Sequence, residues 1–457
     1  MNYKIENIEF LSYSKMANIK GKIYIPDTDN IKGIIQIVHG MLEYFDRYID
    51  AIEFFLKEGY IVCGHDHLGH GDSYSKKEER GYFGEENGYK ALIEDTYSVT
   101  KYVKEKYPKL NYFIIGHSMG SFITRIVVSK YCSSFDGVIF LGTGGPNPLF
   151  KTGIEVANRI AKKKGGSYQS KVLVGMSNKF FNAAVPNQKT DHDWTTRDEE
   201  IIKKRIADKK SDFSFSAKGY VDLFTLAKLA NDPNTLNKID RKMHIGLFSG
   251  DKDPVGNYGK SVIKLYEYLN DNEFENVYIK LYKGARHELL NELNREEVKK
   301  HLLKFIHSIE EDLEKEENTK ITLEEYVIPQ IIEENNINVK KDFAILLKIK
   351  HLKGNYLYGD KDLEVINVVT GKSRNILKPP VITSLIDGCD KLNNNLEKTF
   401  LITNNKLCTM EEAACYMAKV PVVYYLKDKV SDKDKEIKEY IYGQKGTFAL
   451  KEKKFID

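Results

Sequence analysis

The sequence has few cysteines, a single tryptophan and no long apolar run, and each of these scarcities excludes a class of protein. Among its 457 residues are five cysteines, none in the C-x-x-C spacing of a redox or zinc motif. An odd number of widely separated cysteines argues against a disulfide framework, so we expect reduced thiols and a cytoplasmic protein. No stretch reaches the roughly 18 apolar residues that a membrane span needs. The N-terminal segment mixes charged and apolar side chains, unlike a signal peptide.

An excess of charge of one sign is also absent. The chain has 70 basic and 66 acidic residues and a formal net charge of +4. This balance gives no reason to expect nucleic acid as a partner, and basic surface leaves room only for a transient contact with a membrane surface. The content of 41% hydrophobic and 30% charged residues is typical of a globular protein, and the length predicts more than one domain.

Short runs rich in β-branched and aromatic residues alternate with longer amphipathic segments from residue 20 to about residue 310. This alternation predicts an α/β fold with a mostly parallel sheet that is covered by helices on both faces. The predicted strands are Ile34–Val38, Tyr60–Gly64, Tyr112–Ile115, Val138–Leu141, Ile245–Ser249 and Val277–Leu281.

One interval, residues 145–235, breaks this alternation because it is mainly helical. Helical spacing of apolar residues is clear over Arg197–Lys204 and Tyr220–Ala230. Since the interval lies between two sheet strands, we expect a helical cap over the carboxyl edge of the sheet, where such folds bind ligands. A further helix is expected from Asn294 to about Leu313.

A run of charges after this helix is typical of a linker and predicts a boundary between residues 1–318 and residues 319–457. The second part is expected to be a smaller α/β or α+β domain. Thr409 and Glu412 form a capping-box pattern that predicts a helix before its last strand. Its predicted strands are Phe343–Ile349, Glu364–Val369, Phe400–Thr403 and Val422–Tyr425.

The Gly-His-Ser-Met-Gly sequence at residues 116–120 fits the G-x-S-x-G pattern of a nucleophilic serine. Such a match arises by chance in many proteins, but its context is specific here. Tyr112–Ile115 predicts a strand directly before it and Ser121–Lys130 a helix directly after it, which is the strand–turn–helix arrangement of a nucleophile elbow. The pattern therefore indicates Ser118 as a nucleophile.

A serine hydroxyl needs a base, and the base needs an acid that holds its tautomer. The loop after Ile245–Ser249 carries Asp251 and Asp253, and the loop after Val277–Leu281 carries His287. Serine, acid and histidine then follow one another in the chain order of α/β-hydrolases. These residues predict a serine hydrolase in which either aspartate is the acid.

Two backbone N–H groups are expected to hold the oxyanion of the tetrahedral intermediate. Met119 opens the helix after Ser118, and Met41 lies in a glycine turn that follows the strand Ile34–Val38. The alternative for Met41 is a glycine turn that serves only to end a buried strand.

Histidines and aspartates cluster directly after the strand Tyr60–Gly64 and suggest a metal site. Their order does not match the H-x-H-x-D-H pattern of metallohydrolases. We therefore expect a structural loop beside the oxyanion turn and no metal. The residues are His65, Asp66, His67, His70 and Asp72.

Taken together, these motifs are similar to those of the serine aminopeptidase / monoacylglycerol lipase group of α/β-hydrolases, most closely its bacterial lysophospholipase-like members. The resemblance covers about residues 5–310. The matching stretches are Val38–Met41 with Arg47 and Tyr48, His65–Ser73, Gly116–Gly120, Asp193–Asp198, Ser249–Pro254 and Ala285–Glu292.

This resemblance implies that Ser118 is the nucleophile, Asp253 the acid and His287 the base. It also implies hydrolysis of a lipid ester, a monoacylglycerol or a lysophospholipid, through an acyl-enzyme and without a cofactor. In the cap, Phe180, Phe181, Phe215 and Phe224 are candidates for contact with the acyl chain, although most aromatic residues at helical spacing are packed core. Trp194 is expected to be a packing anchor.

Two alternatives remain open. An aminopeptidase of the same fold would need an acidic pocket for the substrate's ammonium group, which Glu199 or Glu200 could supply. The C-terminal region is an extension beyond the resembling hydrolases and could recruit the enzyme to a partner. Its scattered aspartates, which include Asp360, Asp362, Asp387 and Asp390, have no metal-ligand spacing.

Overall fold

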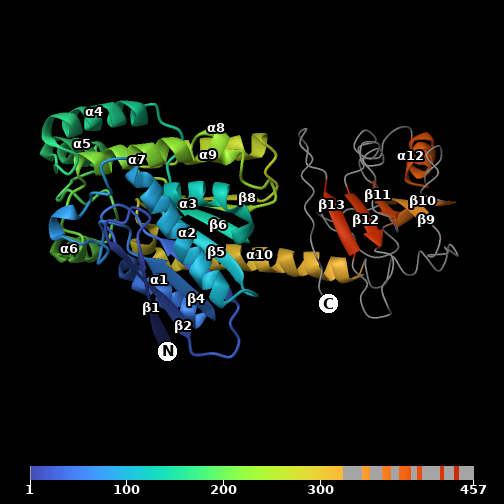
Figure 1. The fold of residues 1–457 in the computed structure, drawn as a ribbon. Helices are drawn as coiled ribbons and strands as arrows, with labels where there is room; N and C mark the ends of the chain where they lie inside the picture. The colour runs from blue at the N-terminus through green and yellow to red at the C-terminus, as the bar shows by residue number, and fades with distance from the viewer. Residues whose placement is uncertain are drawn as a thin grey trace. The chain divides into compact units, whose positions relative to one another are not determined.

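The computed structural model describes residues 2–322, 342–349, 363–371, 380–392, 399–403, 422–426 and 437–441. Contacts divide the chain into two units, residues 1–310 and residues 311–457 (Figure 1). The division falls inside helix α10 (Arg295–Thr322), before the boundary at residue 318 that the charge run predicts. No helix among the described residues is both long and apolar enough to span a lipid bilayer.

An eight-stranded sheet in the order β1-β2-β4-β3-β5-β6-β7-β8 forms the centre of the first unit. Strands β3 to β8 are parallel to one another, and β2 pairs with β4 in the antiparallel sense. This confirms the mostly parallel sheet and its six predicted strands. The strands are β1 (Tyr3–Leu11), β2 (Asn18–Pro26), β3 (Gly33–Val38), β4 (Tyr60–His65), β5 (Asn111–His117), β6 (Gly137–Leu141), β7 (His244–Gly250) and β8 (Val277–Tyr282).

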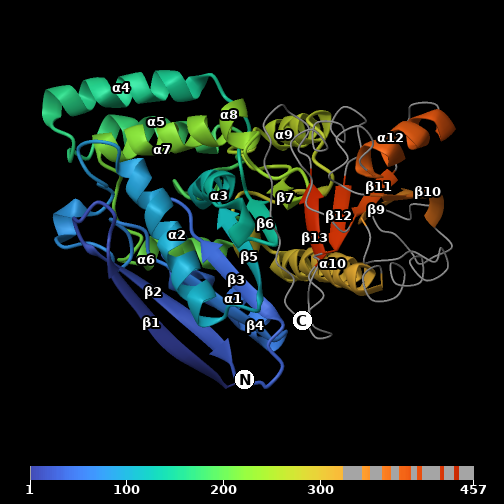
Figure 2. The same cartoon turned by 45° about the vertical axis from the view of Figure 1, so that its right-hand side comes forward.

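The antiparallel pair β1–β2 was not among the predicted strands. Figure 2 shows it at one edge of the sheet, and its register runs from Tyr3 opposite Pro26 to Leu11 opposite Asn18. An edge strand has one solvated face, so charged side chains alternate with apolar ones and the apolar run typical of a central strand is missing. The central strands β3 and β4, by contrast, are buried along their whole length.

Helices cover both faces of the sheet. Helices α2, α3 and α9 share one apolar core with strands β3 and β5. Helix α1 is tied to α10 by an ion pair between Asp50 and Lys299, whose atoms Oδ2 and Nζ are 2.7 Å apart. These helices are α1 (Ile49–Lys57), α2 (Gly88–Lys106), α3 (Met119–Lys130) and α9 (Lys260–Asp271), with short 3₁₀ turns at Phe45–Tyr48, Lys77–Glu79, Cys132–Ser134 and Leu289–Asn291.

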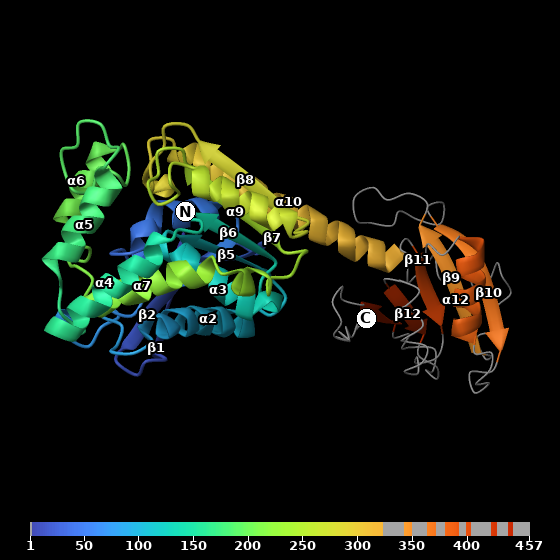
Figure 3. The same ribbon diagram turned by 90° about the horizontal axis from the view of Figure 1, so that it is seen from above.

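The interval between β6 and β7 is helical, as the sequence predicts. Figure 3 shows helices α4 and α7 side by side. The helices are α4 (Leu149–Lys164), α5 (Lys171–Asn182), α6 (Glu199–Ala207), α7 (Ala217–Ala230) and α8 (Pro233–Leu236). We call residues 145–235 the cap.

The second unit contains a five-stranded sheet in the order β10-β9-β11-β12-β13. Its first four strands in the chain lie where the sequence predicts them, β11 and β12 pair in parallel, and β13 was not predicted. The predicted helix at Thr409 and Glu412 lies outside the described residues. The elements are β9 (Asp342–Ile349), β10 (Leu363–Gly371), α12 (Pro380–Lys391), β11 (Thr399–Thr403), β12 (Val422–Leu426) and β13 (Ile437–Ile441).

Candidate active site

Ser118 lies on a strained turn between β5 and α3. Its φ of 53° and ψ of −119° put the backbone in a region that residues other than glycine rarely adopt. A Cβ added to Gly120 would lie 2.1 Å from the carbonyl oxygen of Val38, and one added to Gly116 would lie 2.4 Å from Thr124 Oγ1. The two glycines are therefore required by close packing, and the turn presents a partly exposed serine side chain.

Asp253 and His287 are buried at the ends of two neighbouring strands and form a hydrogen bond. His287 Nδ1 lies 3.0 Å from Asp253 Oδ1. An N–H at Nδ1 that donates to the carboxylate leaves Nε2 free to accept a proton. Asp251 instead accepts a hydrogen bond of 2.7 Å from the backbone N–H of Gly284, so the geometry favours Asp253 as the acid.

Ser118 and His287 are brought together through their neighbours. The ring centres of His117 and His287 are 4.9 Å apart. The Ser118 N–H donates to the carbonyl of Leu141, and the next residue, Gly142, lies against the His287 ring. Among the described residues no hydrogen bond joins the serine hydroxyl to the imidazole, a contact that in many hydrolases tightens only once substrate is bound.

The glycine turn that precedes Met41, the proposed oxyanion turn, packs directly on Ser118. A Cβ added to Gly40 would lie 3.1 Å from Ser118 Cβ, and the Gly40 N–H donates to Glu43 Oε2 at 2.7 Å. In the described part of the chain, neither Met41 nor Met119 uses its backbone N–H in a hydrogen bond to protein. Both groups are therefore free to donate to a bound oxyanion.

A buried group of four charged side chains beside His287 was not predicted as a unit. Glu43, Arg47, Arg205 and Glu288 are each at most 10% exposed, and we call them the charge clamp. Burial alone would raise the pKa of Glu288, but the nearby guanidinium groups lower it to about 2. These four residues come from the first quarter of the chain, from the cap and from the loop of the proposed base. Because they are so far apart in the sequence, no local sequence pattern predicts their contact.

His117 borders this group and is also buried. Its Nδ1 lies 2.8 Å from the Tyr48 hydroxyl and 3.2 Å from Glu43 Oε2. Burial would lower the pKa of His117, but the Glu43 carboxylate outweighs it and raises the pKa. Conversely, His117 and the clamp arginines hold the pKa of the buried Glu43 carboxyl well below its usual range.

His39, His65, His67 and His70 form a second buried group, which we call the histidine cluster. The His67 N–H donates to His39 Nε2 at 2.9 Å, and the two ring centres are 4.1 Å apart. Burial lowers the pKa of His65 to about 3 and that of His70 to about 4, so these rings are neutral at pH 7. In the described ranges, no group of three or more histidine, cysteine or acidic side chains is arranged to hold a metal ion.

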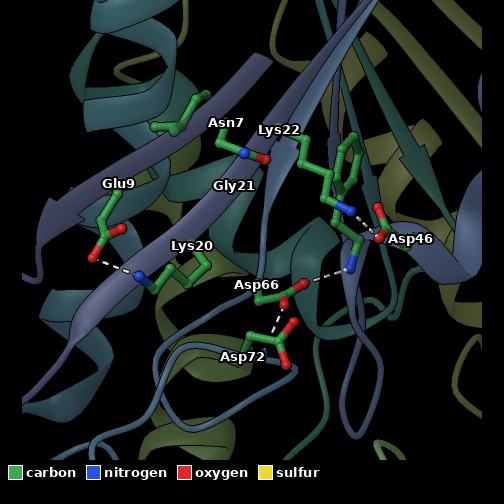
Figure 4. A pocket seen from close by; sticks show the side chains of 10 residues that line it. Asn7, Glu9, Lys20, Gly21, Lys22, Asp46, Asp66 and Asp72 are labelled. Carbon is green, nitrogen blue, oxygen red and sulfur yellow. Dashed lines mark hydrogen bonds and ion pairs between the residues drawn. The ribbon is translucent and has the colours of Figure 1, made fainter. Parts of the chain in front are cut away.

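Asp66 belongs to the same loop and organises its backbone. Its carboxylate accepts hydrogen bonds of 2.8 Å from the N–H groups of Phe45 and Asp72. Figure 4 shows Asp66 and Asp72 at a hollow of about 310 Å³ beside the β1–β2 hairpin. The lysines of this hollow are already paired with acids, Lys20 with Glu9 and Lys22 with Asp46, so neither offers a free positive charge to an anionic ligand.

The aromatic residues of the cap lie in different surroundings. Phe181 stacks on Trp194 with ring centres 4.3 Å apart, and Trp194 lies 4.8 Å from the ring of His287. Trp194 is thus more than a packing anchor of the cap, because it covers the proposed base. Phe180 is 49% exposed, whereas Phe215 is fully buried between Phe83 and the histidine cluster.

Phe224 lies on α7 and stacks on Tyr220, with ring centres 6.1 Å apart. The two glutamates that an aminopeptidase would need are solvent-exposed and paired. Glu199 bonds to Lys189 and Glu200 to Lys203, and the four side chains are between 63% and 73% exposed. They do not form an acidic pocket beside His287.

A serine on a strained strand–helix turn, a buried Asp–His pair at the next strand ends and two free backbone donors define the chain as an α/β-hydrolase. The family described as serine aminopeptidase, S33, matches residues 29–294, and the chain belongs to this family. This confirms the resemblance that the sequence motifs carry.

Curated relatives and solved structures agree with this assignment at low identity. The chain is 25% identical to a monoglyceride lipase homolog of monkeypox virus over 60% of this chain and 88% of the relative. It is 24% identical to a monoglyceride lipase of Rattus norvegicus over 40% of this chain, and the match spans only 54% of that relative. A carboxyl esterase structure from Bacillus coagulans matches 67% of this chain and 98% of that structure at 28% identity and a TM-score of 0.63.

Proposed function

We propose that this hydrolase cleaves carboxylic esters through an acyl-enzyme, with a monoacylglycerol or a lysophospholipid as substrate. The observation that carries the proposal is the buried hydrogen bond of 3.0 Å between Asp253 and His287, at strand ends next to the Ser118 elbow. Because the Nδ1 N–H of His287 donates to Asp253, its Nε2 is left without a proton, as a general base requires.

In this mechanism His287 Nε2 takes the proton of Ser118, whose oxygen attacks the ester carbonyl. The N–H groups of Met41 and Met119 donate to the oxyanion that forms. His287 then gives the proton to the leaving alcohol, and the acyl group stays on Ser118. Water, deprotonated by His287, attacks the acyl-enzyme and releases the acid. Asp253 holds the imidazole and stabilises its protonated form without itself taking the proton.

A lipid substrate is supported by the relatives, several of which are named monoglyceride or monoacylglycerol lipases. Aromatic side chains near the proposed base agree with an acyl chain in the cap: Trp194 lies against His287, and Phe181 stacks on Trp194. Roles of Phe180, Phe215 and Phe224 in substrate binding stay predictions.

The aminopeptidase alternative is disfavoured by charge. A free ammonium group needs an uncompensated carboxylate, and both buried glutamates near His287 face arginines. Glu199 and Glu200 are exposed and paired with lysines. An esterase without an ammonium pocket is the function that these charges support.

A substrate panel tests the proposal. The full chain is assayed with 1-monoacylglycerols and lysophosphatidylcholine of increasing acyl length and with proline and alanine anilides. We expect turnover of the lipid esters and none of the anilides above the background of the Ser118→Ala variant. Hydrolysis of anilides at a higher kcat/KM than any ester would contradict the proposal. Recruitment to a partner by the C-terminal region, residues 319–457, also stays a prediction.

A further inference from the structure

The charge clamp has no part in the steps proposed above, yet it links the cap to the core. Arg205 comes from cap helix α6, Glu43 and Arg47 follow the oxyanion turn, and Glu288 directly follows His287. Arg47 Nη2 and Arg205 Nη1 approach opposite oxygens of Glu288, at 2.6 Å and 2.9 Å. Glu288 is therefore held from both sides, once by the core and once by the cap.

Each catalytic element has a clamp residue next to it. Glu43 accepts the N–H of Gly40, the neighbour of Met41, and faces His117, the neighbour of Ser118. Glu288 is the chain neighbour of His287, and its own N–H donates to the carbonyl of Thr195 in the cap at 2.7 Å. A change in the clamp would therefore be felt at the nucleophile, the oxyanion turn and the base together.

The charges of the clamp balance only while α6 is in place. Two carboxylates face two guanidinium groups, and Arg47 alone cannot neutralise both Glu43 and Glu288. Removing one partner from a buried ion pair leaves an uncompensated charge, which is strongly unfavourable. A displacement of α6 that withdraws Arg205 would thus favour a rearrangement of Glu288, and with it of the loop that carries His287.

We propose that Arg205 and Glu288 are positioning residues that make the alignment of His287 depend on the seating of cap helix α6. The inference rests on the proposed ester hydrolysis, for which His287 is the base. The active site is then fully assembled only beneath a closed cap, which limits hydrolysis to substrates that let α6 return to the core.

The clamp lies beside His287, so a change in its net charge is expected to alter the pH profile of hydrolysis. An unbalanced carboxylate near the imidazole favours its protonated form, and an unbalanced guanidinium disfavours it. Asp253 and His117 contact the His287 ring, and Arg286 and Glu288 are its chain neighbours. The charged or titratable groups that face these residues in turn are Glu43, Arg47, Arg205, His192 and Glu292.

The test compares Arg205→Met, Glu288→Gln and the double variant in the full chain. Lys203→Met is the matched control, because Lys203 lies on the same helix but is 67% exposed. The kcat and KM for one medium-chain ester and the pH profile of kcat/KM are measured. We expect each single variant to lose on the order of 100-fold in kcat, the size that a misplaced catalytic group produces, with a smaller change in KM.

The acid limb of the pH profile of kcat/KM should move in opposite directions in the two single variants. It should rise by about half a unit to one unit in Arg205→Met, fall by a similar amount in Glu288→Gln, and return to its original position in the double variant. The double variant should also recover part of kcat. Shifts of the same sign, no shift in either single variant, or a double variant as impaired as the product of the singles would overturn the proposal.

Two outcomes need a separate measurement: an Arg205→Met variant that does not fold, and an unmodified chain that hydrolyses no ester. If Arg205→Met does not fold, Arg205→Lys replaces it: retained charge with altered geometry should lower kcat but leave the acid limb unchanged, and a shifted limb would contradict the clamp. If the unmodified chain hydrolyses no ester, the proposed function fails. The clamp is then tested by the double-mutant cycle in unfolding free energy, where strictly additive effects of Arg205→Met and Glu288→Gln would refute it.

Discussion

Two groups of buried histidines lie on either side of the oxyanion turn, and they differ in whether carboxylates face them. His117 Nδ1 lies 3.2 Å from Glu43 Oε2, and His287 Nδ1 lies 3.0 Å from Asp253 Oδ1. In the histidine cluster, the described contacts of the rings are to one another, to backbone groups and to aromatic side chains.

The consequence is an opposite response to burial. Glu43 raises the pKa of His117 although burial would lower it, whereas burial lowers the pKa of His65 to about 3. A carboxylate in direct contact with the ring stabilises the proton on a histidine, and among the described residues only the first group has such a contact. Glu43 also acts on His39 and His70, but there burial outweighs it and lowers the pKa. The second group is suited to neutral packing behind the oxyanion turn.

Substituting one histidine from each group should give the largest difference in activity between the two groups. We expect His287→Ala to lower kcat on the order of 10⁶-fold, as loss of a catalytic base does in serine hydrolases. His65→Gln should retain kcat within about threefold, because its ring has no role in proton transfer. Turnover of a medium-chain ester checks both. Equal losses in the two variants would mean that the cluster takes part in the chemistry.

The sequence predicts His287 and the structural loop of the histidine cluster, but it assigns no role to His117. Ser118 and His287 lie in loops that follow predicted strands, where local motifs and chain order carry the information. The contacts that surround these residues cannot be predicted in this way. Arg205 and Glu288 are 83 residues apart in the chain, and the spacing of His65 and His70 does not show that they are buried.

The sheet shows the same limit. The six strands β3 to β8 are predicted because their residues are mostly apolar or aromatic, and β3 and β4 are buried along their whole length. By contrast, β1 and β2 have charged residues between apolar ones, and β13 has Lys438 and Glu439 among its five residues. Cap helices are predicted as helices, but their contacts are not. Phe180, Phe181, Phe215 and Phe224 look alike in sequence, but their surroundings differ. Phe180 is exposed, Phe181 stacks on Trp194, Phe215 is in the core, and Phe224 stacks on Tyr220 of its own helix.

Substituting the carboxylate partner of His287 should have the next largest effect on activity. Asp253→Asn should lower kcat on the order of 10⁴-fold, because the amide no longer supports the productive tautomer. Asp251→Asn is the control, since Asp251 accepts a backbone N–H and does not contact His287. The same ester assay separates them, and a larger loss in Asp251→Asn would exchange the two assignments.

Phe215 packs on the histidine cluster, so its removal should affect stability rather than catalysis. Phe215 is fully buried, and truncation to alanine should cost about 3–5 kcal/mol of unfolding free energy. At temperatures where the variant is folded, KM for esters of every chain length should stay unchanged. Urea unfolding and steady-state kinetics measure the two effects, and a selective rise in KM for long chains would assign Phe215 to the acyl site.

The neutral cluster should also give a pH-dependent stability. Below pH 6.5 the unfolded chain binds a proton at His65, whereas the folded chain does so only near pH 3. The contribution of His65 is therefore complete above pH 6.5 and is lost as the pH falls toward 3.

His65→Gln lacks this titration and isolates it from all other groups. Relative to the variant, the unmodified chain should lose about 2 kcal/mol of unfolding free energy between about pH 7.5 and pH 5. Denaturant unfolding at both pH values measures the difference. A constant difference would show that His65 is protonated in the fold, which would place a proton acceptor beside it.

The central claim is that Ser118 is acylated with His287 as its base, and covalent labelling tests it most directly. The full chain is treated with a fluorophosphonate, and peptides are mapped by mass spectrometry. We predict a single adduct on Ser118 that forms much more slowly in the His287→Ala variant. An adduct on another residue, or labelling of Ser118 at an equal rate in both proteins, would contradict it.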